Sequence, residues 1–488
     1  MIEYLDLEKR MKYISIVIFF LALITMSCPD DGSGGSSNTK RSFWAADLSG
    51  KNEEFYRLEA SLLVRNSGCE VWAEIGCGVD ETTAQRIANE YSNNIFPKIM
   101  EAFGWVDKEK VNVMQYADLM GDKNGKLIIL LLDIKDGYTE GGGYVAGYFN
   151  PLNMYKNAPH SNECDMIYLD TKPSVVGTPD FYETIAHEMQ HLMNFVTSTC
   201  FYQDDNLRHG YMDTWIDEGL SSAAEWVYSG HQNKGRINWF NADETGLLSR
   251  GDNFYAWDNH KNETKAILND YATVYLFFQW LRIQYGDEGI YREILISKYS
   301  NQQAVVDVMG YESWDSLLQT WLTANYNPAG KFGYGDDPDL SKIRPHYAPD
   351  KISEINLFPG EGVYSLNAPD EIPVIDNHGN NINYAYITGN ANAVFHTLLT
   401  YNRSTNIKGS VEKGFVTGIV PVKPAANISS RSVIPPISGP YKIGVGDLQR
   451  QKSNDQNEPF LSFPDAVSGQ SRVNIEMFLP FTGNDIIR

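Results

Sequence analysis

Residues 178–195 constrain the fold most, because their pattern fits a single kind of element. Thr178 is a favourable N-cap, Pro179 suits the first turn of a helix, and Asp180 places a negative charge at the helix's positive end. His187 and His191 are four residues apart, so a helix projects both imidazoles to one side. The sequence therefore predicts a helix with two histidines on the same face.

These histidines form the pattern His187-Glu188-x-x-His191, whose spacing meets the geometric needs of a zinc site. A tetrahedral zinc ion accepts both imidazoles, and Glu188, about 100° further round the helix, can reach a water held there. We therefore predict His187 and His191 as metal ligands and Glu188 as the general base. The alternative is a helix whose histidines only pack or face solvent.

A catalytic zinc ion takes a third protein ligand and keeps one position open for water. In one known arrangement of zinc ligands the third ligand is a histidine at the position that Thr197 occupies here, so this chain does not use that arrangement. A second helix, predicted from about Thr214 to Ser229, carries Glu218 near its start, and Glu225 follows seven residues later on nearly the same face. Glu218 is the predicted third ligand, and Glu225 is the competing one.

The two predicted helices that carry these residues resemble segments of a known protein family. The segments H-E-M-Q-H-L-M-N-F (187–195) and W-I-D-E-G-L-S-S-A-A-E (215–225) resemble the gluzincin metallopeptidases, and within them they are most similar to the neutral zinc metallopeptidases of the hyicolysin family. The resemblance covers residues 126–286. It implies a zincin-like catalytic domain, one catalytic Zn²⁺ with Glu218 as a ligand, and hydrolysis of a protein or peptide substrate.

The sequence also departs from other gluzincins. The gap between His191 and Glu218 is longer than in thermolysin-like enzymes, which implies an extra loop over 200–211. The glycine-rich strand over 141–150 lacks the glutamate with which gluzincin aminopeptidases capture a substrate amine. This departure favours an endopeptidase, and we expect the strand segment Tyr144, Val145 and Ala146 to dock an extended peptide by strand addition.

The reaction also needs a donor for the oxyanion that develops during peptide hydrolysis. Tyr271, on a third predicted helix over 270–285, resembles the position at which related enzymes place a tyrosine, and Tyr275 one turn later is the alternative. Asn194 shares the side of His191 and is expected either to orient a ligand or to be a surface or capping residue. Further candidate donors are His209, His231 and His260.

The remaining elements predict an α+β architecture. Two strands over 55–74 precede helical spacing over 81–103, and the apolar run over 126–134 predicts a buried central strand. Beyond a Gly-, Pro- and Asp-rich stretch over 334–350, short apolar runs between turn residues predict a small all-β sandwich. We therefore expect a zincin-like domain over 41–335 and a β-sandwich domain over 345–488.

Residues 1–28 predict a secretory signal peptide. Lys12 precedes an apolar run over 13–26 that is too short to span a bilayer, and we expect translation to start at Met11. The end of this segment resembles a bacterial lipobox, so Cys28 is the predicted lipidation site; plain secretion with cleavage near Ser27 is the alternative. With a Gly/Ser-rich tether over 29–40, the pattern predicts an exported lipoprotein of the cell envelope or surface.

The acidic balance excludes one class of partner. A formal net charge of −22 repels polyphosphates, so we expect no nucleic-acid partner, and we assume a monomer.

A polar stretch over 118–126 resembles a Ca²⁺ loop but lacks the bidentate glutamate, so a simple turn is the better interpretation. Four cysteines beyond Cys28 permit two disulfides or free thiols: Cys69, Cys77, Cys164 and Cys200.

Two functions of different classes fit these observations. One is an exported, lipid-anchored zinc endopeptidase. The other is a surface lipoprotein with an inactive protease fold that binds a partner through its C-terminal β domain. The first is favoured because the sequence keeps all four residues of the metal site and its base, namely His187, Glu188, His191 and Glu218.

Overall fold

The structure is a computed structural model, and it describes residues 39–49, 54–104, 126–139, 144–155, 158–197, 212–243, 246, 248–250, 254, 264–326, 328–344 and 346, with four further strands between 362 and 419. The chain divides into two units, residues 1–39 and 40–488. Several predictions lie outside the described residues: the signal peptide and Cys28, most of the tether, the calcium-like loop up to Gly125, Cys200, His209 and His260.

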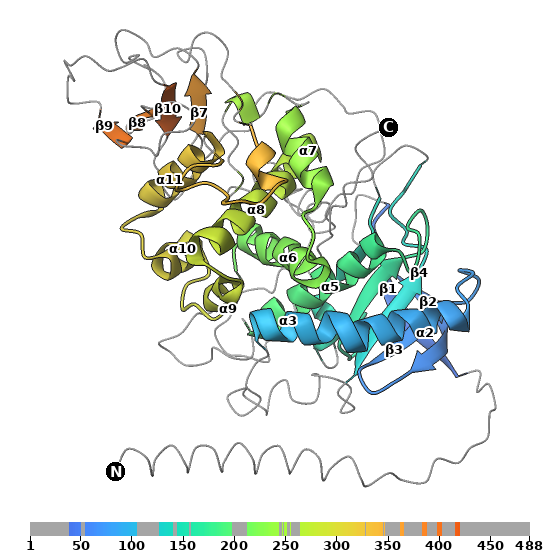
Figure 1. Cartoon of the computed structure of the whole chain (residues 1–488). Coiled ribbons are helices and arrows are strands. Elements are labelled where there is room, and N and C mark those ends of the chain that lie inside the picture. The colour runs from blue at the N-terminus through green and yellow to red at the C-terminus, as the bar shows by residue number, and fades with distance from the viewer. Residues whose placement is uncertain are drawn as a thin grey trace, which may run out of the picture. The chain divides into compact units, whose positions relative to one another are not determined.

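A six-stranded mixed sheet forms the framework, in the order β1-β2-β3-β4-β6-β5. Figure 1 labels β1 to β4 of this sheet. The pairs β3–β4 and β4–β6 are parallel, and the pairs β1–β2, β2–β3 and β5–β6 are antiparallel. Its strands are β1 (Lys40–Asp47), β2 (Glu54–Arg65), β3 (Cys69–Glu74), β4 (Leu127–Leu132), β5 (Gly147–Phe149) and β6 (Met166–Asp170). Among the described residues, β5 is therefore an edge strand.

The central strand β4 is apolar along its whole length because both faces of the sheet are covered. Ile129 and Leu131 face the core shared with the helices, while Ile128 and Leu130 face a second core built with β1. All six residues of β4 are buried. The predicted buried central strand over 126–134 is thus confirmed, since side chains of a strand alternate between two apolar environments.

The predicted helical stretch over 81–103 is confirmed as α2 (Glu81–Glu90), η2 (Tyr91–Ile95) and α3 (Phe96–Phe103). The later helices are α5 (Pro179–Val196), α6 (Thr214–Ser229), α7 (Lys234–Ala242), α8 (Thr264–Tyr285), α9 (Gly289–Leu295), α10 (Gln302–Met309) and α11 (Trp314–Tyr326). Short single turns are η3 (Pro151–Met154), η5 (Leu248–Arg250) and η7 (Leu340–Lys342). None of the described helices is long and apolar enough to cross a membrane.

Helix α5 begins where its sequence predicts, because the Thr178 side chain accepts a hydrogen bond from the N–H of Phe181. It packs against β5 and β6 and also against α6, which lies beside it in Figure 1. Gly147 permits this approach to the sheet: a Cβ there would lie 2.9 Å from Thr184 of α5. The helix that carries both histidines therefore lies against the edge strand.

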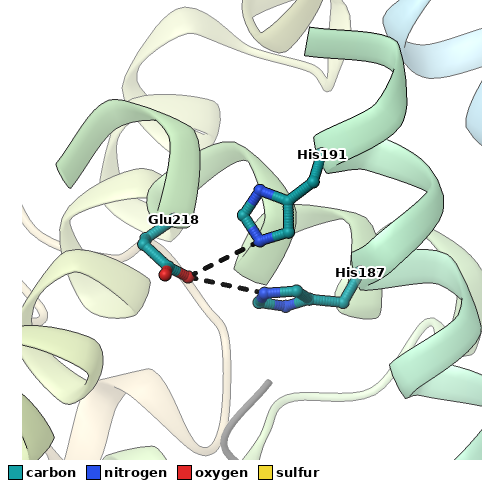
Figure 2. Close-up of side chains that lie close together, drawn as sticks. All are labelled: His187, His191 and Glu218. Carbon is teal, nitrogen blue, oxygen red and sulfur yellow. Dashed lines mark ion pairs between the residues drawn. The ribbon is translucent and has the colours of Figure 1, made fainter. Parts of the chain in front are cut away.

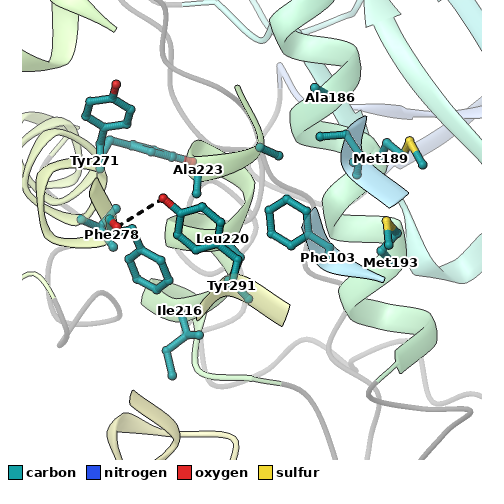
Figure 3. Close-up of a cluster of buried hydrophobic side chains, with 14 of the residues drawn as sticks. Phe103, Ala186, Met189, Met193, Ile216, Leu220, Ala223, Tyr271, Phe278 and Tyr291 are labelled. Carbon is teal, nitrogen blue, oxygen red and sulfur yellow. Dashed lines mark hydrogen bonds between the residues drawn. The ribbon is translucent and has the colours of Figure 1, made fainter. Parts of the chain in front are cut away.

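Helix α6 lies between α5 and α8. Figure 3 shows the apolar side chains that fill this interface, which include Met189 of α5, Leu220 of α6 and Phe278 of α8. Gly219 lets α8 come close, because a Cβ at this position would lie 2.1 Å from the Phe278 ring. Burial of these side chains on adjoining helices holds three elements of the candidate site together.

A separate four-stranded antiparallel sheet has the order β7-β10-β8-β9. Its strands are β7 (Gly362–Ser365), β8 (Asn383–Ile387), β9 (Leu398–Asn402) and β10 (Phe415–Ile419). Short strands are thus present in the region where the sequence predicts them. That this sheet is part of a β-sandwich domain over 345–488 stays a prediction.

Two cysteines of the described region, Cys69 and Cys77, are free thiols. Cys69 and Cys77 form no disulfide in the structure, so the permitted Cys69–Cys77 bridge is absent. Cys69 is buried with its Sγ 4.0 Å from the carbonyl oxygen of Ala88, and this burial raises the pKa of its thiol to about 12. A thiol with such a pKa stays protonated at neutral pH and is chemically inert.

Candidate metal centre

Three buried side chains from two helices converge on one point. His187 and His191 come from α5 and Glu218 from α6, and one ligand atom of each lies within 4.8 Å of the other two. Glu218 Oε2 is 3.4 Å from Nε2 of His187 and 3.8 Å from Nε2 of His191 (Figure 2). Two imidazole nitrogens and one carboxylate oxygen are a donor set that hydrolytic zinc sites use. These residues therefore fit a zinc ion.

The competing ligand, Glu225, lies on the opposite side of the His187 ring. Its Oε1 is 2.8 Å from Nδ1 of His187, whereas Glu218 approaches Nε2. A carboxylate is an acceptor, so this contact places the proton of neutral His187 on Nδ1 and leaves the Nε2 lone pair directed at the shared point. Glu225 thus orients His187, and the structure groups Glu218 with the two histidines.

The second histidine is oriented by residues from the same turn as Glu218. Nδ1 of His191 is 2.9 Å from Ser221 Oγ and 3.1 Å from Asp217 Oδ2. Asp217 also accepts a hydrogen bond from the Asn194 side chain. Asn194, which the sequence offers as an orienting residue, therefore acts on His191 through Asp217.

The third ligand candidate is held by a tyrosine of α8. The Tyr271 hydroxyl donates to Glu218 Oε1 over 2.8 Å, while Oε2 faces the histidines. The alternative Tyr275 points elsewhere: its hydroxyl accepts from the N–H of Asn233 and donates to Gln232 Oε1. Burial raises the Tyr275 pKa well above its usual value. Of the two tyrosines, the structure brings Tyr271 to the metal centre.

The predicted base is buried. Glu188 is fully inaccessible to solvent and follows His187 directly on α5. Helical geometry places its side chain about 100° round the axis from that histidine. His231, by contrast, is exposed just beyond the end of α6.

The predicted docking segment precedes β5 at the sheet edge. Its residues Tyr144, Val145 and Ala146 are buried, and part of their backbone is already engaged. The Val145 N–H donates to Asp136 Oδ2 over 2.6 Å, and the Ala146 carbonyl accepts from the N–H of Asp170 over 2.9 Å. Peptide groups of successive strand residues point to opposite sides, so those of Gly147 point away from β6.

Sequence patterns did not identify several residues of this centre. Asp217 and Ser221 flank Glu218 within one helical turn, so their helical position relative to that glutamate was an available signal. Arg236, which contacts Glu225, lies on α7, and no motif spacing marks it. Contacts between side chains on different helices are set by tertiary packing, which local spacing does not report.

Comparison with known proteins agrees with the geometry. No protein-family model matches the chain. Neutral metalloprotease ShpI of Staphylococcus hyicus is 28% identical over 357 residues, which cover 70% of this chain and 75% of that protein. Together with the group His187, His191 and Glu218, this similarity supports a metalloprotease. The chain is accordingly a relative of the neutral zinc metallopeptidases.

Proposed function

We propose that this protein is an exported zinc endopeptidase that hydrolyses peptide bonds within protein or peptide chains. The observation that carries the proposal is the convergence of His187, His191 and Glu218 within 4.8 Å in a buried setting. Zinc fits this donor set, and when bound it acidifies water and polarises the carbonyl group of a peptide bond.

Glu188 is the proposed general base. It takes a proton from the attacking water and passes it to the leaving amine as the peptide bond breaks. Its complete burial supports this role, because a carboxylate shielded from bulk solvent exchanges its proton with the reacting groups instead of with bulk water.

Tyr271 is the proposed donor to the oxyanion. Its hydroxyl is in the centre already, 2.8 Å from Glu218 Oε1. To stabilise a substrate oxygen, this hydroxyl must donate its hydrogen bond to the substrate in place of the Glu218 carboxylate. Alternatively, it shares the hydrogen bond between the carboxylate and the substrate. A buried donor that needs little movement loses little reorganisation energy on reaction.

The substrate is proposed to add to the sheet edge at Tyr144, Val145 and Ala146. Among the described strands, none pairs with β5 on the side away from β6. The outward peptide groups of Gly147 extend this rail, and Gly147 itself packs against α5, which carries the base. We propose that an extended peptide binds there through main-chain hydrogen bonds, by strand addition.

Location and domain organisation are part of the same proposal. We propose a signal peptide ending at Cys28, lipidation of that residue, a zincin-like domain over 41–335 and a β-sandwich domain over 345–488. The short-strand pattern of the C-terminal region and the Gly/Ser-rich stretch over 29–40 support this arrangement.

The function is tested by the hydrolysis of casein-derived peptides by residues 41–488 and by the Glu188→Gln variant. We expect the wild type to cleave within peptides and the variant to lose at least about 10²-fold in kcat, because a general base contributes that much or more. Both proteins should bind one zinc ion with similar affinity. A zinc-loaded wild type that cleaves no peptide in a broad set would favour the inactive-fold lipoprotein instead.

A further inference from the structure

Arg236 is a buried cation that the proposed reaction does not use. It lies on α7 and is completely inaccessible to solvent. Moving a charged group out of water is unfavourable, and only well-formed hydrogen bonds and ion pairs offset this desolvation penalty. Its position therefore requires specific partners, and these partners lead to the metal centre.

The first partner is Glu225, which orients His187. Arg236 NH2 donates to Glu225 Oε1 over 2.9 Å, the same oxygen that accepts from His187 Nδ1 over 2.8 Å. The other oxygen, Oε2, accepts from the side chain of Asn233 over 3.1 Å. Both oxygens of Glu225 are thus held in place, and the guanidinium compensates the buried negative charge.

Asn233 links this arrangement to the start of α7. Its Oδ1 caps the helix by accepting from the N–H groups of Gly235 and Arg236, while its Nδ2 binds Glu225. The carboxylate therefore also lies at the helix end where the dipole favours negative charge. The local fold of α7 and the orientation of Glu225 depend on the same asparagine.

The second partner is Tyr271, which holds Glu218. Arg236 NH1 donates to the Tyr271 carbonyl oxygen over 3.2 Å, and the guanidinium carbon is 5.2 Å from the centre of the Tyr271 ring. The hydroxyl of that ring donates to Glu218 Oε1. One cation thus reaches two of the three candidate ligands, each through a single intervening residue.

We propose that Arg236 is a positioning residue for metal binding, which fixes His187 through Glu225 and Glu218 through Tyr271. The inference rests on the proposed zinc site. Glu225 lies on α6 and Tyr271 on α8, so the arginine on α7 joins three helices at the back of the site. A planar guanidinium can donate to both acceptors at once, whereas a lysine ammonium on a flexible stem matches this geometry poorly.

The test is the zinc dissociation constant, measured by competition with a chelator for the wild type and for four variants. These are Glu225→Gln, Arg236→Gln, Arg236→Lys and the double variant Glu225→Gln/Arg236→Gln. Each single glutamine substitution should weaken zinc binding about 10- to 100-fold, as loss of groups that orient metal ligands does. Arg236→Lys should fall between Arg236→Gln and wild type.

The double variant shows whether Arg236 and Glu225 affect zinc binding through the same contact with His187 or independently of each other. If Arg236 acts on His187 through Glu225, the combined loss of affinity is smaller than the product of the two single losses. A matched control is Arg282→Gln: Arg282 is also a helical arginine with hydrogen bonds, but its contacts include Gln279, Tyr291 and the Trp226 ring, and none of these residues binds a candidate ligand. This control should bind zinc as the wild type does.

A second readout separates positioning from stability alone. The absorption spectrum of the Co²⁺-loaded protein reports ligand geometry, and we expect the Arg236→Gln spectrum to differ from the wild-type spectrum. A folded Arg236→Gln protein with wild-type zinc affinity and an unchanged cobalt spectrum would overturn the inference. If Arg236→Gln does not fold, the near-isosteric Glu225→Gln decides by the same two measures. Failure of the wild type itself to bind zinc would instead overturn the proposed function.

Discussion

At the scale of single residues, each candidate ligand makes a polar contact with another side chain through an atom other than the one directed at the metal site. Glu225 binds His187, Ser221 and Asp217 bind His191, and Tyr271 binds Glu218. Such contacts fix ring orientation and tautomer before a metal arrives. The ligand residues were predictable from spacing along two helices, but Arg236 was not, because its contact with Glu225 spans two helices.

The role of Tyr271 can be determined by measuring separately its effect on zinc binding, through Glu218, and its effect on catalysis, through the oxyanion. Tyr271→Phe removes the hydroxyl that donates to Glu218, so zinc affinity should fall about 10-fold. If the hydroxyl also stabilises the oxyanion, kcat at saturating zinc should fall about 10²-fold with little change in KM. Steady-state kinetics over a series of zinc concentrations measure both effects. An unchanged kcat at saturating zinc would restrict Tyr271 to holding the ligand.

At the scale of secondary-structure elements, strongly patterned segments were predictable and weakly patterned ones were not. The capped helix α5 and the apolar strand β4 follow from local signals. The strand β1 was missed, because its polar start Lys40-Arg41-Ser42 gives little alternation and its pairing with β2 is decided by tertiary contacts. Helices α7, α9, α10 and α11 were not predicted, and the first three are too short to show a clear helical period.

Gly219 tests how helix packing supports the site. Gly219→Ala places a methyl group 2.1 Å from the Phe278 ring, so the ring or the helices α6 and α8 must shift. We expect a loss of about 1–3 kcal/mol in the free energy of unfolding, typical of overpacking, and weaker zinc binding because Glu218 is adjacent. Urea denaturation measures the first effect. Adding Phe278→Leu should restore part of the stability; no recovery would place the strain elsewhere.

Asp170 at the end of β6 predicts a pH dependence of stability. Burial raises its pKa to about 6, although its side chain accepts from the N–H groups of Ile134, Lys172 and Ser174. A carboxyl whose pKa is higher in the folded state binds its proton more tightly there. Its contribution therefore favours folding at low pH and is lost as pH rises from about 4 to 6, by about 3 kcal/mol.

Comparison of the wild type with Asp170→Asn isolates this effect from other acidic groups. The difference in unfolding free energy between the two proteins should change across pH 4 to 6 and be constant above it, because the variant has no proton to lose at this position. Urea denaturation at a series of pH values measures it. Parallel stability curves over the whole range would show that Asp170 does not titrate as described.

At the scale of the whole molecule, the mixed helical and sheet architecture agrees with the predicted α+β class. Local periodicity was sufficient for this class, since the order of helices and strands already restricts the layers that can form. The strand order β1-β2-β3-β4-β6-β5 could not be predicted, because it depends on pairing between segments far apart in the chain. The domain boundaries and the lipid anchor stay predictions.

The most direct test of the central claim is X-ray absorption spectroscopy at the zinc edge, on protein loaded with one zinc ion per chain. The account predicts two imidazole nitrogens at about 2.0–2.1 Å, with the remaining ligands oxygen and no sulfur. The Glu218→Ala variant should lose zinc or one oxygen ligand, while Arg282→Gln should give the wild-type spectrum. A sulfur ligand near 2.3 Å, or a wild-type protein that binds no zinc, would contradict the assignment of His187, His191 and Glu218.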